Sequence, residues 1–190
     1  MAATLDTSQR ILDIAERLVQ TRGFNGFSYA DIAEAMKVTK ASLHYHFRSK
    51  AELGARLIER YEKNFLAALA AIDEQTDDAG EKLRRYAAIY TSVVRANRMC
   101  LCGMLAAEYG TLPEAMRDDM RHFFDENERW LVAVLKQGKK AKQLAFKGSP
   151  SDAAQALVGS LEGAMMIARS YGDPKRFEAV AERLLVDFGA

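Results

Sequence analysis

A short basic segment contains the residues whose chemistry is most informative. Between Lys37 and Lys50 the sequence also places Lys40, Arg48 and two histidines, without a single Asp or Glu. The net charge of the whole chain is only +1, so positive charge is concentrated in this segment. Clustered cations without acids are typical of a surface that binds phosphate groups. The segment therefore predicts an interaction with a nucleic acid.

Hydrophobic spacing around this segment predicts two short helices joined by a three-residue turn. Ile32 and Met36 recur at helical spacing before the turn, and Leu43 and Phe47 do so after it. These apolar faces would pack together as a helix-turn-helix, with the second helix beginning after Thr39. In that motif the second helix enters the major groove of DNA. The alternative is a basic helical hairpin that packs and has no further role.

A helical wheel separates the inner face of the second helix from its outer face. Leu43 and Phe47 lie inside, while Tyr45 is among the residues that point farthest outward. Small outer residues let a helix approach base edges, and polar ones reach phosphates. The candidate DNA-contacting residues are Ser28, Lys37, Thr39, Lys40, Ala41, Ser42, His44, Tyr45, His46 and Lys50.

The segment resembles the DNA-binding head of the TetR family of bacterial transcription regulators. The resemblance rests on the run Leu43-His44-Tyr45-His46-Phe47-Arg48-Ser49-Lys50, on Gly23-Phe24 upstream and on Val38-Thr39-Lys40 in the turn. Two positions depart from the family's pattern, because Lys37 stands where Gly is usual and His44 where Tyr is usual. A non-Gly residue in the turn is expected to adopt a positive φ at some expense of stability.

The resemblance implies a homodimeric repressor that binds a palindromic operator in double-stranded DNA and is released by a small-molecule inducer. It further implies a DNA-binding domain over residues 1–49 and a ligand-binding and dimerisation domain over residues 50–190. An enzyme and a structural DNA-binding protein without a ligand are the alternatives. The sequence shows no nucleophile–base pair, no Gly-rich phosphate loop and no metal-ligand spacing, so we expect no catalytic residue, metal or cofactor.

Composition favours helices over strands, because Ala and Leu greatly outnumber Val and Ile. Apolar periodicity, proline positions and capping patterns predict an all-α fold of about nine helices. They span about residues 8–22, 81–96, 101–109, 113–140 and 150–172, and further helices begin after Ser28 and Thr39 and at Ser49 and Pro174. No apolar run is long enough to cross a membrane, the first residues contain no secretory signal, and only two cysteines are present. The expected location is a reducing cytoplasm.

The second half of the chain is rich in methionine and aromatic residues, which suit a cavity for an apolar or aromatic inducer. For any one of these side chains, ordinary core packing is the alternative. The candidate pocket residues are Tyr86, Tyr90, Cys100, Met104, Met120, Phe123, Asn127, Trp130 and Met166.

Cys100 and Cys102 lie in the run MCLCGMLAAE, which resembles a TetR subgroup with a cysteine near the start of its sixth helix. Some members of that subgroup sense electrophiles or oxidants through this cysteine, and Cys100 matches its position. A thiol-based sensing repressor is therefore an alternative function. The simpler interpretation, which we favour, is that both cysteines are small buried hydrophobic residues.

Two apolar stripes near the C-terminus are candidates for the dimer interface. The resemblance implies a four-helix interface made by the last two helices of each protomer. We expect Leu157, Leu161, Met165 and Leu184 to form it. The alternative is that these stripes face only their own protomer's core.

Overall fold

The computed structural model describes residues 7–190, and this part of the chain is helical without strands. The elements are α1 (Thr7–Arg22), α2 (Tyr29–Met36), α3 (Lys40–His46), α4 (Lys50–Gln75), α5 (Ala79–Arg95), α6 (Leu101–Ala107), η1 (Tyr109–Thr111), α7 (Glu114–Lys140), α8 (Pro150–Ser170) and α9 (Pro174–Asp187). The prediction of an all-α fold with about nine helices is confirmed within these residues.

Side-chain caps fix where several helices begin. Ser28 caps α2, its hydroxyl accepting from Ala30 N–H, while Asp31 accepts from the Ser28 backbone N–H at 2.8 Å. Ser149 caps α8, its hydroxyl accepting from the Asp152 N–H at 3.0 Å, directly before a proline in the first turn. These contacts satisfy N–H groups that have no partner inside the helix. The capping-box pattern of the sequence is thus borne out at Ser28.

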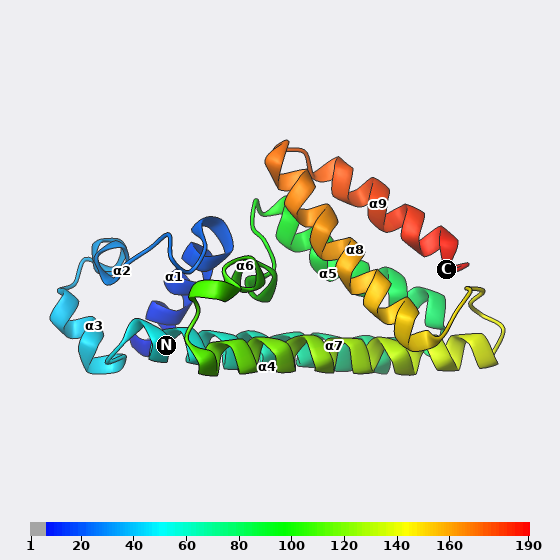
Figure 1. The fold of residues 1–190 in the computed structure, drawn as a ribbon, viewed down its shortest axis with the longest axis horizontal. Helices are drawn as coiled ribbons and strands as arrows, with labels where there is room; N and C mark the ends of the chain where they lie inside the picture. The colour runs from blue at the N-terminus through cyan, green and yellow to red at the C-terminus, as the bar shows by residue number, and fades with distance from the viewer. Residues whose placement is uncertain (1–6) are drawn as a thin grey trace, which may run out of the picture. The chain divides into compact units, whose positions relative to one another are not determined.

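The chain divides into two compact units. The first comprises the chain up to Glu62 together with Leu101–Phe123, and the second comprises Lys63–Cys100 and Phe124–Ala190. In the first unit α2 packs between α1 and α3, and α6 packs against α1 (Figure 1). In the second unit α9 packs against both α8 and α5 (Figure 1). The long helices α4 and α7 each contribute residues to both units.

One carboxylate holds the loop between α1 and α2. Glu108, which follows α6, accepts hydrogen bonds from the backbone N–H of Phe24 at 2.6 Å and of Asn25 at 3.2 Å. Gly23 precedes them with a φ of 84°, and a Cβ added there would lie 2.7 Å from Glu108 Oε1. The backbone conformation therefore favours glycine at this position, and a larger residue would in addition displace the Glu108 carboxylate.

The expected dimer stripe of α8 is buried within the protomer. Leu157, Leu161 and Met165 retain at most 2% of their accessible surface, and Leu184 on α9 is half-buried. Side chains packed into their own core are not available to a second protomer. This corrects the expectation for the three α8 residues, because an amphipathic stripe indicates burial but not which surface covers it.

The turn after α2 adopts the conformation that the sequence predicts. Lys37 has φ 57° and ψ 43°, in the left-handed region, and its N–H bonds to Glu34 carbonyl. A residue with a Cβ is strained in this conformation, whereas glycine is not.

We therefore expect Lys37→Gly to raise the free energy of unfolding by up to about 1 kcal/mol, measured by urea denaturation. The matched control is Ala35→Gly, an exposed position inside α2. There glycine should lower the free energy of unfolding by about 1 kcal/mol. Equal losses in both variants would contradict the assignment of strain to Lys37.

Candidate nucleic-acid interface and ligand site

The second helix of the motif, α3, presents one face to the core and the other to solvent. Leu43 and Phe47 are 1% and 5% exposed, as the wheel predicts. Tyr45 is 86% exposed, and the edge of its ring meets His46 at 5.3 Å between centroids. The Tyr45 side chain is therefore accessible to a partner.

Most of the other candidates in the turn and on α3 are exposed as well. Lys37, Thr39, Lys40, Ala41 and His44 are exposed, whereas Ser42 and His46 are half-buried. The hydroxyl of Thr39 accepts from the Ser42 N–H at 3.3 Å and so caps α3. The structure therefore brings together the exposed turn before α3 and the outer face of α3, and both are basic.

A cleft of about 360 Å³ lies beside this face, lined by Phe27, Ser28, Tyr29, Ala30, Lys40, His44 and Lys50. It combines a helix N-terminus with three basic side chains, which is the chemistry of a phosphate site. His44 Nδ1 lies 3.2 Å from the Arg48 carbonyl oxygen, and its ring packs on Tyr29. These two contacts fix the orientation of the His44 ring and therefore determine which edge of the ring faces the cleft.

Lys50 is held more firmly than the sequence suggested. Its ammonium donates to the Phe27 carbonyl oxygen and lies 4.7 and 4.3 Å from the ring centroids of Phe24 and Phe27. Burial lowers the pKa of Lys50, while Glu108 acts in the opposite direction. Lys50 therefore lines the cleft as a partly buried structural cation and does not extend into solvent.

Polar groups meet in the interior of the second unit. The Tyr86 hydroxyl donates to Asn127 Oδ1 at 2.8 Å, and Asn127 Nδ2 donates to the Tyr90 hydroxyl at 3.1 Å. Trp130 stacks on Tyr86 with ring centroids 5.7 Å apart, and Phe65 contacts both tyrosines at 6.2–6.3 Å. Burial raises the pKa of both tyrosines. The structure thus brings four of the candidate pocket residues into one aromatic cluster.

Two family models match these parts of the chain. Residues 11–57 match "Bacterial regulatory proteins, tetR family", and residues 79–184 match "Tetracyclin repressor-like, C-terminal domain". The chain belongs to the TetR family. It is accordingly a DNA-binding transcriptional regulator with a ligand-binding C-terminal domain, and not an enzyme.

Similar proteins cover nearly the whole chain. The HTH-type transcriptional repressor NemR of Escherichia coli is 27% identical over 172 residues, covering 86% of this chain and 84% of NemR. A TetR-family regulator from Agrobacterium tumefaciens has a solved structure with 32% identity and a TM-score of 0.93, covering 96% and 97% of the two chains. A TetR regulator from Legionella pneumophila has 33% identity and a TM-score of 0.89, covering 99% and 100%.

The other pocket candidates of this TetR-family chain are placed differently. Met104 is half-buried and Met120 and Phe123 are buried, all three in the first unit. Met166 in the second unit is 53% exposed, so its place in a ligand pocket stays a prediction. Cys100 is 2% exposed and belongs to the second unit.

Sequence reasoning missed Glu162, which lies on α8 near Cys100. Both of its carboxylate oxygens are buried without a hydrogen-bond partner. Burial raises the pKa of Glu162 to about 7, although the Cys100 thiol acts to lower it. The sequence feature that could have identified Glu162 is the presence of an acid beside Leu161, within a run of apolar and small residues.

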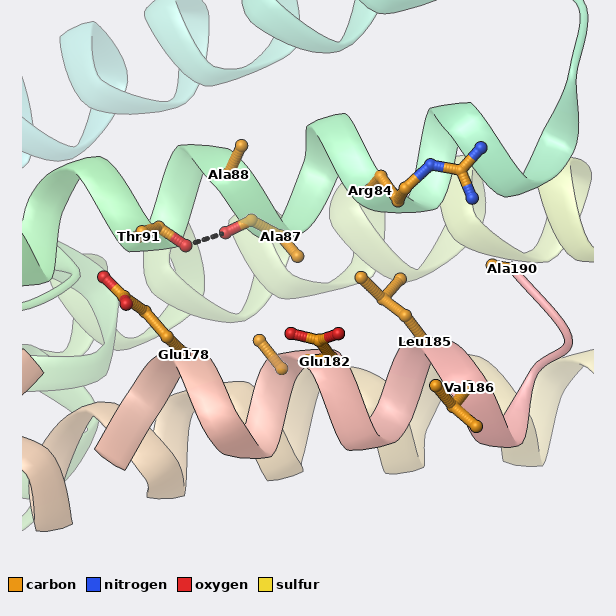
Figure 2. Close-up of a pocket in the computed structure, with 10 residues that line it drawn as sticks. Arg84, Ala87, Ala88, Thr91, Glu178, Glu182, Leu185, Val186 and Ala190 are labelled. Carbon is orange, nitrogen blue, oxygen red and sulfur yellow. Dashed lines mark hydrogen bonds between the residues drawn. The ribbon is translucent and has the colours of Figure 1, made fainter. Parts of the chain in front are cut away.

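A groove between α5 and α9 is a separate feature of the second unit (Figure 2). Its volume is about 360 Å³, and it is lined by Arg84, Ala87, Ala88, Thr91, Glu178, Ala181, Glu182, Leu185, Val186 and Ala190. In Figure 2 the carboxylate of Glu182 points from α9 toward α5. None of the candidate pocket residues lines this groove.

Among residues 7–190, no group of three or more His, Cys, Asp or Glu side chains is placed to hold a metal ion. No helix in the described part of the chain is long and apolar enough to cross a membrane.

The buried carboxyl should make stability depend on pH. The folded chain holds the Glu162 proton more tightly than the unfolded chain, whose glutamate titrates near 4.5. Raising the pH from about 5 to about 8 should therefore lower the wild-type free energy of unfolding relative to Glu162→Gln.

Urea denaturation of both proteins across this range measures the difference. The control is Glu178→Gln, which alters a half-buried glutamate that is paired with Arg95 at 2.7 Å. This control should follow the wild type. Parallel curves for wild type and Glu162→Gln would show that Glu162 titrates as an ordinary surface acid.

Proposed function

We propose that this TetR-family regulator is a repressor that binds a palindromic operator in double-stranded DNA as a homodimer and is released by a small molecule. The observation behind the proposal is the outer face of α3, where Tyr45 stands exposed among basic groups. Such a face fits the major groove, while the adjacent basic cleft fits the DNA backbone. A bacterial repressor of this kind acts in the cytoplasm, where the DNA is.

The dimer proposal rests on the exposed face of α8. Met166 and Ile167 are 53% and 57% exposed, and Gly159 and Gly163 lie on preceding turns of the helix. No atom lies within 4 Å of a Cβ added at either glycine, so the face is open. Small residues followed by exposed apolar ones allow close approach of a second helix. We therefore place the two-fold axis here instead of at Leu161.

The ligand proposal rests on the aromatic cluster around Tyr86. A ligand can lower DNA affinity only by binding better to the form that does not fit the operator. The continuous helix α4 is the natural link, because its residues begin in the DNA-binding unit and end in the unit that contains the cluster.

The thiol-sensing alternative has less support. Cys100 is almost completely buried, and the neighbouring carboxyl of Glu162 would disfavour a thiolate through like-charge repulsion. A ligandless structural role is also less well supported, because it gives no reason for the polar groups inside the second unit.

We expect Tyr45→Ala to weaken operator binding at least about tenfold while leaving the melting temperature unchanged. The operator is first selected from random double-stranded oligonucleotides with the wild-type protein, and it should be an inverted repeat. Affinity is then measured by fluorescence anisotropy at fixed salt.

Tyr109→Ala provides the control, since this tyrosine is 41% exposed and lies outside α3. It should bind the operator as the wild type does. Normal binding by Tyr45→Ala would remove this face from the interface, and a selected site without two-fold symmetry would argue against a dimer on DNA.

We also expect Ile167→Glu to convert the dimer into a monomer in sedimentation experiments. The protomer should keep its fold, because the side chain is exposed, and operator affinity should fall because a single recognition helix reads too few base pairs. Val186→Glu is the matched control, since Val186 is 58% exposed on α9 and lines the α5–α9 groove. If only Val186→Glu dissociates the dimer, the interface lies on the α9 side.

A further inference from the structure

Glu162, on α8 in the second unit, is half-buried as a residue, but both of its carboxylate oxygens are buried. Neither oxygen of Glu162 has a hydrogen-bond partner, although α8 otherwise buries Leu161 and Met165 on this stretch. Leaving a buried polar group unpaired destabilises the folded state, and more so when the group is charged. An apolar side chain could occupy this position without that destabilisation, so packing alone does not explain the presence of an acid.

Apart from the Cys100 thiol, which acts to lower the pKa of Glu162, the neighbouring polar groups do not bond to its carboxyl. The hydroxyls of Tyr86 and Tyr90 and the amide of Asn127 bond to one another in a network that uses none of the Glu162 oxygens. The charge of the Glu162 carboxylate is nevertheless among the causes that raise the pKa of both tyrosines. The carboxyl is thus an available acceptor beside a completed network.

The walls of this region are aromatic. Trp130 stacks on Tyr86, and Phe65 meets both tyrosines edge-on at interplanar angles of 87° and 80°. Aromatic faces attract cations, and the attraction increases when the cation is shielded from water. A cation would also neutralise the buried carboxylate, which a neutral ligand cannot do.

We propose that Glu162 is the anionic recognition group of the ligand site and that the ligand is an organic cation with a flat apolar body. The proposal deepens the proposed function and rests on it, because it names the class of molecule that releases the regulator from DNA. The positive group would contact Glu162, and the flat body would pack among the rings of Tyr86, Tyr90 and Trp130.

Three bicyclic probes of similar size separate charge from shape. N-methylquinolinium is a permanent cation, quinoline is uncharged at about pH 7 and above, and 1-naphthoate is an anion. Titration calorimetry measures their affinities, and fluorescence of Trp130, the single tryptophan of the chain, reports binding at the cluster. We expect the wild type to bind the cation at least about tenfold more tightly than the neutral probe, and to reject the anion.

Matched variants assign this preference to one carboxylate. Glu162→Gln should lose the preference for the cation while its affinity for quinoline stays the same, and Glu162→Asp, which keeps the charge, should retain it. Glu182→Gln removes an exposed carboxylate that lines the α5–α9 groove and should behave as the wild type. Loss of the preference in Glu182→Gln instead would overturn the proposal in favour of the groove.

The same protein samples are tested for release from the selected operator. N-methylquinolinium should release the wild type and not Glu162→Gln. If the wild type binds the operator but shows no preference for the cation, this inference fails and the proposed repressor function stands. If binding of the cation depends on Glu162 but no operator can be selected, the proposed function fails and the cation site stands.

Discussion

The shortness of the recognition helix is the constraint on which the rest of the first unit depends. With seven residues, α3 is far below the ~12–15 at which an isolated helix becomes marginally stable in water. Its shape therefore comes from tertiary contacts. Leu43 is buried beneath it, and the Tyr29 hydroxyl donates to the Phe47 carbonyl at 2.9 Å where the helix ends. Tyr45 can remain exposed only because the opposite face is anchored in this way.

The same requirement explains the contact between α6 and the loop that precedes α2. Glu108 accepts from two consecutive backbone N–H groups, and Asn25 adds a side-chain bond to Thr111 at 2.7 Å. Hydrogen bonds to an ionised carboxylate are stronger than neutral ones. A displacement of α6 would therefore break them or shift the loop with it. The position of α2, against which α3 packs, thus depends on a segment some 80 residues away in sequence.

The sequence predicts those features that depend on interactions within a few residues, and it predicts features that depend on distant contacts less well. The helix-turn-helix, its caps and the positive φ of Lys37 follow from periodicity and backbone sterics within a few residues, and all were predicted. The burial of Leu161 was predicted as well, but not the surface that covers it, because periodicity does not distinguish a protomer's own core from a partner. The contacts of Lys50 with the rings of Phe24 and Phe27 were not predicted for a similar reason, since these rings reach it only in the folded chain.

Glu162 shows the limit of prediction from sequence patterns and suggests why that limit exists. A folded core built only for stability would avoid an unpaired acid, since ionisation of the buried group opposes folding at neutral pH. Sequence patterns describe what most positions do for the fold, so a position that works against the fold stands outside them. In a regulator, such a position is useful if a ligand relieves the strain. The energy regained by pairing the carboxylate is then available to favour the ligand-bound form over the DNA-bound form.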